Sequence, residues 1–264
     1  MSASEDELLA VAHEAAGAAS TELMSRFGGQ LRGVRTKSTA TDPVSEADLC
    51  AEAAIRRILT ERRPEDAILG EEGGESGEGE LRWIVDPLDG TVNFLFGIPQ
   101  FSVSVACQDR DGMVVGVVLD PVREETFAAT RSGPPTLNDS AIAGSTREDL
   151  ATALVSTGFA YDAAVRAKQA EVMARVLPRV RDIRRAGSAA LDLAWLASGR
   201  YDAYYERGVN LWDYAAGGLI ASRAGLTVRE LAPAQDGPAG LAAAAPALMD
   251  PLLDLILGGA GASG

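Results

Sequence analysis

The chain has 264 residues, 47% of them hydrophobic, and a formal net charge of −14 at pH 7. This composition is typical of a soluble globular protein with a sizeable core, and no apolar run approaches the roughly 20 residues of a membrane span, so we expect no membrane partner. Because clustered Lys and Arg are needed to neutralise phosphates, the acidic balance argues against nucleic acid binding. Residues 1–7 lack the basic-then-apolar order of a signal peptide, so we predict a cytoplasmic protein.

Two residue types narrow the possible chemistry. The cysteines, Cys50 and Cys107, have neither disulfide-framework nor zinc-site spacing. The only histidine, His13, lies in a helical pattern with no nucleophile motif beside it, and a Ser-His-Asp or Cys-His mechanism would have to use it. Any hydrolysis by this chain would therefore depend on metal ions or carboxylates.

The first half of the chain predicts two helices followed by strands. Helical spacing of apolar residues indicates a helix over 4–26, with Ser4 as N-cap and Gly28 just beyond its end. A second helix covers about 45–63 and stops at Pro64. Apolar runs then predict a series of strands, which we interpret as an antiparallel meander. They lie near 66–70, 82–86, 101–107, 113–119 and 125–130.

The pattern changes after about residue 145 to alternating strands and helices. The expected elements are strand 153–156, helix 162–177, strand 182–185, helix 188–198, strand 201–205 and helix 212–224. This alternation is typical of a largely parallel sheet. We therefore predict one domain over 1–264, with an α+β half to about 145, an α/β half from about 146, and a ligand site where they meet.

Acids gather at the ends of the predicted strands. The stretch W-I-V-D-P-L-D-G-T ends an apolar run in Asp86 and Asp89, while Glu71 and Glu72 end another run and Asp213 opens a helix-like segment. Two carboxylates about 4 Å apart repel by roughly 4 kcal/mol at an effective dielectric near 20, so such a group needs a cation or a proton. For D-P-x-D alone, turn formation explains the acids equally well; the additional acids favour Mg²⁺, which prefers oxygen ligands.

The same turn has backbone groups that suit a metal and a phosphate. The Leu88 carbonyl can point in the same direction as the two carboxylates. Gly90 and Thr91 open a short helix, and the first N–H groups of a helix can hold a phosphate oxygen.

Four segments resemble the inositol monophosphatase family. Residues 83–94, W-I-V-D-P-L-D-G-T-V-N-F, resemble its first signature, and residues 212–225, W-D-Y-A-A-G-G-L-I-A-S-R-A-G, resemble its second. Residues 70–72, G-E-E, and residues 37–48, K-S-T-A-T-D-P-V-S-E-A-D, resemble its G-E-E element and its mobile loop with the following helix. Their order and spacing fit over roughly 5–257. The resemblance implies a five-layered αβαβα sandwich that hydrolyses a phosphate monoester with Mg²⁺.

The resemblance also implies a set of two to three Mg²⁺ ions per site. Glu71, Asp86 and the Leu88 carbonyl would hold the first ion. Asp86, Asp89 and Asp213 would hold the second, and a third, weaker ion would lie near Glu71. Lithium sensitivity is implied as well, because Li⁺ would compete for the second position.

Catalytic roles follow from the same resemblance. Thr91 and Glu71 would orient and deprotonate the attacking water, Asp48 would hydrogen-bond Thr91, and Lys37 would lie on a loop that closes over the metals. The residues expected to contact substrate are Asp89, Gly90, Thr91, Gly187, Ser188, Ala189, Glu206 and Asp213. From the residues alone, Ser188 is explained at least as well as a helix cap, and Glu206 equally well as a surface acid.

These implications favour myo-inositol 1-phosphate as substrate, in a homodimer. Asn93 resembles the inositol monophosphatase branch, whereas Phe96, Asp139 and Leu226 depart from the usual pattern. The alternative substrates are histidinol phosphate, fructose 1,6-bisphosphate and 3′-phosphoadenosine 5′-phosphate. A non-catalytic binding role is an alternative of a different class, since some relatives resemble RNA-polymerase-associated factors.

Overall fold

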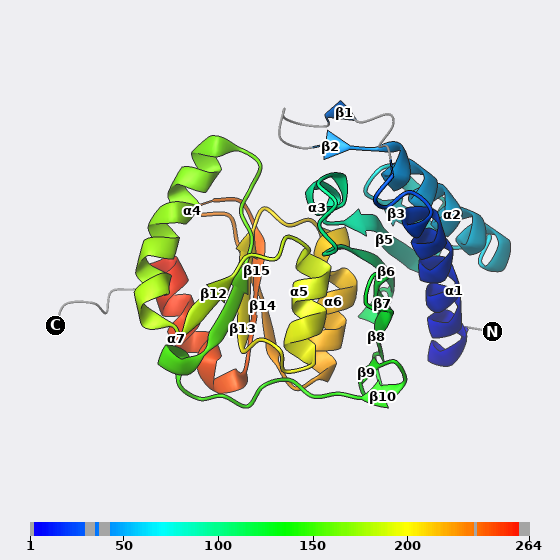
Figure 1. The fold of residues 1–264 in the computed structure, drawn as a ribbon. Helices are drawn as coiled ribbons and strands as arrows, with labels where there is room; N and C mark the ends of the chain where they lie inside the picture. Colours follow the sequence, from blue (N-terminus) through cyan, green and yellow to red (C-terminus); the bar gives the residue numbers. More distant parts are fainter. Residues whose placement is uncertain (1–2, 30–34, 37–42, 235–236, 259–264) are drawn as a thin grey trace.

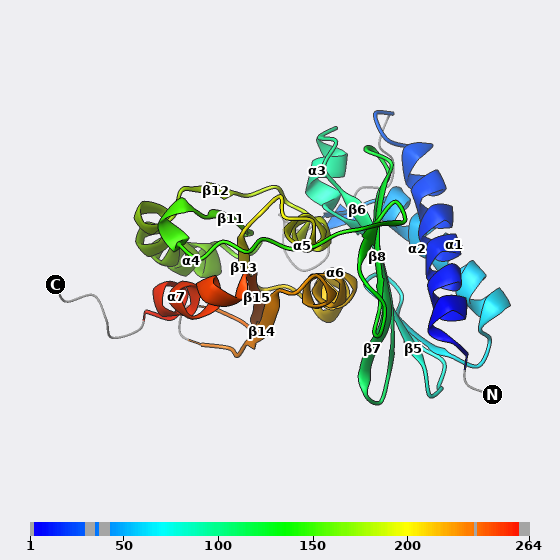
Figure 2. The ribbon, with the colours of Figure 1, turned by 90° about the horizontal axis from the view of Figure 1, so that it is seen from below.

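A computed structural model describes residues 3–29, 35–36, 43–234 and 237–258. Figures 1 and 2 show five layers: α1 with α2, a first sheet, α5 with α6, a second sheet, and α4 with α7. The expected αβαβα sandwich is therefore confirmed. The described helices are α1 (Glu5–Met24), α2 (Glu46–Arg62), α3 (Thr91–Leu95), α4 (Ala163–Val176), α5 (Ala189–Ala197), α6 (Leu211–Arg223) and α7 (Pro246–Leu257), with 3₁₀ turns η1 (Leu150–Thr152) and η2 (Leu177–Arg179).

The first sheet has the strand order β10-β9-β8-β7-β6-β5-β3-β4. From β5 to β8 consecutive strands pair antiparallel, which confirms that part of the predicted meander. The prediction was wrong at its first step, because the chain forms a hairpin from β3 to β4 and then crosses back, so that β5 runs parallel to β3. The strands are β3 (Ala67–Gly70), β4 (Gly74–Ser76), β5 (Arg82–Asp89), β6 (Ser102–Asp109), β7 (Gly112–Asp120), β8 (Glu125–Thr130), β9 (Thr136–Leu137) and β10 (Ser140–Ala141), besides a separate pair, β1 (Arg35–Thr36) and β2 (Pro43–Val44).

The second sheet is mixed, with the order β12-β11-β13-β15-β14. The predicted parallel arrangement holds for β12, β11 and β13, but β15 pairs antiparallel with both β13 and β14. The prediction missed β14, β15 and α7. Of these, β15 is short and alanine-rich, so it carries little β-propensity signal. The strands are β11 (Leu154–Thr157), β12 (Asp182–Arg184), β13 (Ala203–Arg207), β14 (Thr227–Leu231) and β15 (Gly240–Ala244).

Two hydrophobic cores hold these layers together. One lies between α1, α2 and the first sheet, and the other extends from the opposite face of that sheet through α5 and α6 to the second sheet. Close approach of α6 to the first sheet depends on small residues, since a Cβ on Gly116 would lie 2.9 Å from the Ala216 Cα. This contact brings the start of α6, which carries Asp213, toward the end of β5.

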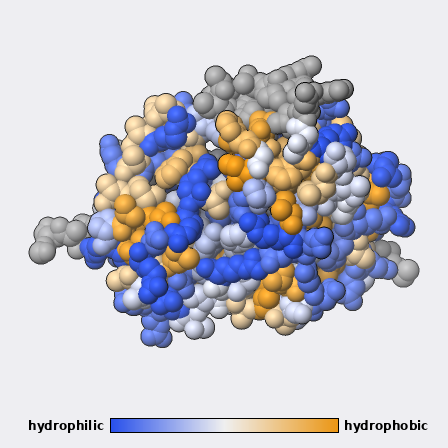
Figure 3. Space-filling model, viewed as in Figure 1, coloured by the Kyte–Doolittle hydropathy of each residue, from blue (hydrophilic) through white to orange (hydrophobic). Residues whose placement is uncertain are grey.

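The departures from the family pattern lie outside the acid cluster. Phe96 ends α3 and is 78% exposed, and Figure 3 shows hydrophobic surface gathered over α3. Asn138 and Asp139 form a turn with positive φ, a conformation that these two residue types tolerate. Leu226 is buried, and a Cβ on Gly144 would lie 2.6 Å from its Cδ2 atom.

None of the helices in the described part of the chain combines the length and apolarity needed to cross a membrane.

Candidate functional site

The predicted site residues meet at one cavity of about 320 Å³, which is lined by the ends of β5 and β13 and by the starts of α5 and α6. Such a volume is within the range of small-molecule sites. Asp48 and Ser188 are not part of the lining, although both contact residues that are, and Lys37 lies outside the described residues. The predicted residues that line the cavity are Glu71, Asp86, Leu88, Asp89, Gly90, Thr91, Gly187, Ala189, Glu206 and Asp213.

The end of β5 forms a tight, internally bonded turn. Asp86 is 1% exposed, and its Oδ1 accepts the Leu88 N–H at 3.0 Å. The pairing of β5 with β6 shifts register between Asp86 and Asp89, where Pro87 has no N–H to donate. Gly90 follows at φ +102°, and a Cβ there would lie 3.0 Å from the Gln100 carbonyl oxygen. Both its dihedral angle and its surroundings therefore require glycine.

Thr91 is held from behind by Asp48, as expected from the resemblance. Its hydroxyl donates to Asp48 Oδ1 at 3.0 Å and also lies 3.1 Å from the Leu88 carbonyl oxygen. Asp48 is itself fixed as part of a capping box at the start of α2, where its Oδ2 accepts from the Ser45 N–H and hydroxyl. The orientation of the Thr91 oxygen is therefore determined by the buried start of a helix.

Four carboxylates from three segments of the chain line the cavity together: Glu71 after β3, Asp86 and Asp89 on β5, and Asp213 on α6. Burial raises the pKa of Asp86 well above its ordinary value, and the charges of Glu71, Asp89 and Asp213 raise it further. The pKa of Asp213 is also well above its ordinary value, first because of burial and then because of Asp89 and Glu71. Each ionised acid thus disfavours the charge on its neighbours, a situation that a bound cation would relieve.

The donor chemistry of this cluster fits a hard divalent cation, because it consists of carboxylates and the Leu88 carbonyl. Among the residues that the structure describes, no three Asp, Glu, His or Cys side chains are already arranged around a single metal position.

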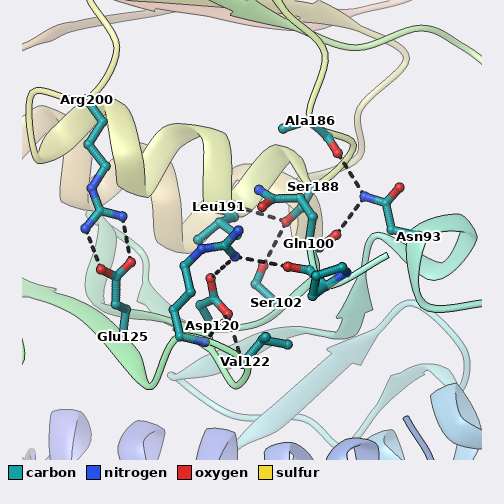
Figure 4. A network of polar contacts seen from close by, with 12 residues as sticks. Asn93, Gln100, Ser102, Asp120, Val122, Glu125, Ala186, Ser188, Leu191 and Arg200 are labelled. Atoms are coloured by element: carbon teal, nitrogen blue, oxygen red, sulfur yellow. Dashed lines mark hydrogen bonds and ion pairs between the residues drawn. The ribbon is translucent and has the colours of Figure 1, made fainter. Parts of the chain in front are cut away.

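Asp89 is tied to the start of α5. Its Oδ2 accepts from the Ser188 hydroxyl at 2.6 Å and from the Ala190 N–H at 2.7 Å. Burial nevertheless raises the pKa of Asp89 to about 6, against the opposing effect of these hydrogen bonds. Ser188 is the N-cap of α5, which confirms the helix-cap interpretation of this residue. Its hydroxyl oxygen lies 3.0 Å from the Ser102 hydroxyl oxygen (Figure 4). Ser188 therefore contacts Asp89 rather than the cavity.

The opposite end of the cavity is built from β13 and the loop before α5. Glu206 lies on β13 and faces the cavity, which excludes its explanation as a simple surface acid. Burial raises the pKa of Glu206 to about 7, although the Arg185 charge lowers it. The Tyr204 hydroxyl donates to Glu206 Oε2 at 3.1 Å. Gly158 admits this carboxylate, because a Cβ there would overlap it.

Asn93 connects the two ends of the cavity. Its Nδ2 donates to the Gln100 carbonyl at 2.7 Å and to the Ala186 carbonyl at 2.8 Å (Figure 4). The loop that carries Gly187 is thereby attached to α3, which follows directly after the acid-bearing turn.

Sequence reasoning missed several lining residues. Arg185 is exposed and lines the cavity near Glu206; its place two residues before Gly187 was a signal that could have identified it. Asn210 caps α6, and its N–H donates to Asp213 Oδ2 at 2.6 Å. The lining residues 159–162 precede α4 and belong to no motif that the sequence offers.

Comparisons with known proteins agree with this architecture. The structure resembles the crystal structure of the extragenic suppressor protein suhB from Bartonella henselae, with a TM-score of 0.87, 34% identity, and coverage of 94% of this chain and 98% of that one. The inositol-1-monophosphatase SuhB of Mycobacterium tuberculosis is 45% identical over 242 residues, which cover 87% of this chain and 83% of the relative. The Nus factor SuhB of Pseudomonas aeruginosa is 45% identical over 197 residues, covering 70% and 71%.

Fold and cavity thus define a layered α/β protein of the phosphatase type. A family model described as the inositol monophosphatase family matches residues 4–253. The chain belongs to the inositol monophosphatase family, whose members are generally metal-dependent.

Proposed function

We propose that this protein hydrolyses a small phosphate monoester, myo-inositol 1-phosphate, with the help of Mg²⁺. The observation that carries the proposal is the convergence of Glu71, Asp86, Asp89 and Asp213 on one cavity, beside the Thr91 hydroxyl. These residues come from segments that lie far apart in the sequence. Their carboxylates repel one another, and cations bound between them would offset this repulsion.

Two ions would share this cluster, and a third would lie near Glu71. Glu71, Asp86 and the Leu88 carbonyl would hold one ion, and Asp86, Asp89 and Asp213 the other. When bound, Mg²⁺ supplies charge that favours deprotonation of the attacking water and departure of the alkoxide.

The chain's own groups orient the reactants. Because the Thr91 proton is donated to Asp48 or Leu88, the lone pairs of the Thr91 oxygen remain to accept a proton of the attacking water. Glu71 accepts the proton that this water loses. The N–H groups of Gly90 and Thr91, at the start of α3, donate to phosphate oxygens. Catalysis would rest on positioning and charge, without a covalent bond to the protein.

The end of the cavity that contains Glu206, Gly187 and Ala189, here called the polyol end, would select the alcohol part of the substrate. Glu206 can accept hydrogen bonds from two adjacent hydroxyls, with Gly187 and Ala189 shaping the wall beside it. This arrangement suits a polyhydroxylated substrate such as inositol. Histidinol phosphate stays an alternative, because its ammonium and imidazole N–H groups can also donate to a carboxylate. Fructose 1,6-bisphosphate and 3′-phosphoadenosine 5′-phosphate are the remaining alternatives.

A substrate panel tests the proposal. Phosphate release is measured from inositol 1-phosphate, histidinol phosphate, fructose 1,6-bisphosphate and 3′-phosphoadenosine 5′-phosphate, in Mg²⁺ and in EDTA. We expect Mg²⁺-dependent release with inositol 1-phosphate preferred. Activity that persists in EDTA would refute the mechanism, and a preference of about a hundredfold for another ester would refute the substrate.

A second role is suggested by the relative named Nus factor SuhB, which favours association with transcription proteins. Pull-down from a lysate with the wild-type chain and with Asp89→Asn separates this role from catalysis, because a non-catalytic interaction would survive the substitution. Homodimer formation, lithium sensitivity and a cytoplasmic location stay predictions from the sequence; the exposed Phe96 and Ile98 side chains provide apolar surface for a dimer contact.

A further inference from the structure

Helix α2 carries a polar stripe made of Asp48, Glu52 and Arg56. Spacings of four residues place these side chains on one face of the helix. Asp48 is 0% exposed and Glu52 is 2% exposed. Burial of acids at successive turns of a helix costs free energy unless each acid is hydrogen-bonded. The hydrogen-bond partners of Asp48 and Glu52 therefore indicate the structural role of the stripe.

Glu52 binds the backbone immediately after Glu71. Its Oε2 accepts the Glu72 N–H at 2.7 Å, and its Oε1 accepts the Gly73 N–H at 2.8 Å. Arg56 Nε donates to the same Oε1 at 2.7 Å. Hydrogen bonds to an ionised acceptor are stronger than neutral ones, so this carboxylate is a firm anchor for the segment.

The anchored segment is shaped to receive the carboxylate. A Cβ on Gly70 would lie 2.5 Å from Glu52 Oε1, and a Cβ on Gly73 would lie 2.6 Å from the same atom. Arg56 also donates to the Gly74 carbonyl at 2.6 Å and to the Ser76 hydroxyl at 2.9 Å. The two glycines and the arginine together attach the β3–β4 hairpin to α2.

We propose that Glu52, oriented by Arg56, is a positioning residue that fixes Glu71 relative to Thr91. Asp48 holds the Thr91 hydroxyl, and Glu52, one turn later on the same helix, holds the backbone next to Glu71. One rigid helix thereby sets the separation of the two groups that would act on the attacking water. This inference rests on the proposed function for the roles of Glu71 and Thr91.

The test compares Glu52→Gln with Glu61→Gln. Both residues are on α2 and pair with an arginine four positions away, but the Arg57–Glu61 pair is 3.6 Å long and exposed. In Glu52→Gln the new amide group would face an N–H donor that now binds a carboxylate oxygen. Three quantities are measured: amide hydrogen exchange at Glu72 and Gly73, the rise in melting temperature on adding Mg²⁺, and kcat with KM.

We expect Glu52→Gln to lose protection at both amides and to need about tenfold to a hundredfold more Mg²⁺ for the same rise in melting temperature, the usual cost of removing a group that orients a metal ligand. Its kcat should fall by a similar factor with KM little changed, while Glu61→Gln matches the wild type. If Glu52→Gln does not fold, Arg56→Lys, which keeps the charge but loses the planar fork, should show the same changes to a smaller degree.

Wild-type Mg²⁺ dependence and kcat in the folded Glu52 or Arg56 variant would overturn the inference, even if the variant were less stable. A wild-type protein that binds Mg²⁺ but hydrolyses no ester would refute the proposed function alone. Hydrogen exchange at Glu72 and Gly73 and the Mg²⁺-dependent melting temperature would still show whether Glu52 fixes the backbone beside Glu71.

Discussion

The two ends of the cavity are built in different ways. At the acid end, Asp86 and Asp48 are almost fully buried, and their oxygens accept hydrogen bonds from neighbouring backbone and side chains. At the polyol end, Arg185 is exposed and the loop before α5 is attached to the rest of the cavity through Asn93. The acid end is built mainly from the first half of the chain, with Asp213 added from α6, whereas the polyol end combines β13 with the loop before α5.

This difference indicates how the protein divides its tasks. Groups that act on the phosphate gain from rigidity, because small displacements cost much of the rate. Groups that would recognise the alcohol lie on β13 and on the loop before α5, outside the turn that follows β5. We therefore expect substitutions at the acid end to reduce kcat, and substitutions at the polyol end to act mainly on KM.

The largest effect is expected for Asp89→Asn. The asparagine oxygen can still accept from Ser188 and Ala190, so α5 keeps its cap while the cavity loses one charge. We expect kcat/KM for phosphate release to fall by about a thousandfold. Asp139→Asn is the matched control, because Asp139 is exposed and its φ of 64° suits asparagine. Full activity in Asp89→Asn would contradict the assigned role.

Thr91→Val removes the hydroxyl but keeps the shape of the side chain. We expect kcat to fall by about a hundredfold, and the free energy of unfolding to fall by about 1–3 kcal/mol because Asp48 loses a buried donor. Steady-state kinetics and urea denaturation measure the two effects. Thr60→Val, at an exposed position on α2, should change neither. Unchanged kcat with reduced stability would limit Thr91 to a structural role.

Asn93→Ala tests the polyol end. Loss of the hydrogen bond to Ala186 should loosen the loop that carries Gly187. We expect KM for inositol 1-phosphate to rise by about tenfold, which corresponds to about 1.4 kcal/mol, while kcat stays near the wild-type value. The opposite result, a lower kcat with constant KM, would mean that Asn93 acts on the acid end.

The pH dependence of stability gives the smallest effect. Because burial raises the pKa of Glu206 from 4.5 to about 7, its contribution to stability is complete below pH 4.5 and is lost as the pH rises through 7. In EDTA, Glu206→Gln should therefore show a smaller decline of the urea midpoint between these pH values than the wild type. Glu230→Gln, at an exposed position on β14, should follow the wild type. Parallel declines in all three proteins would contradict the raised pKa.

Local signals predicted much of the fold and of the acid end. Helix starts at Ser4 and Ser45 depend on a capping residue and an acid three positions later, and both capping boxes are present. The turn after β5 is encoded by D-P-x-D-G-T within a few residues, so its geometry could be predicted without knowledge of the rest of the chain.

Tertiary contacts could not be predicted in the same way. Glu52 is one of 38 acids, and its role depends on Gly70 and Gly73, which reach it only through the fold. The alanine-rich strand β15 has no alternating pattern, so the antiparallel part of the second sheet was missed. Arg185 faces the cavity because its loop is attached to Asn93, a contact across 93 residues.

A crystal structure with Mn²⁺ in place of Mg²⁺, analysed by anomalous scattering, tests the central claim most directly. We predict anomalous peaks between Glu71, Asp86, Asp89 and Asp213, with the Leu88 carbonyl among the ligands. Active crystals without a peak at these four acids, or with the ions bound elsewhere, would contradict it.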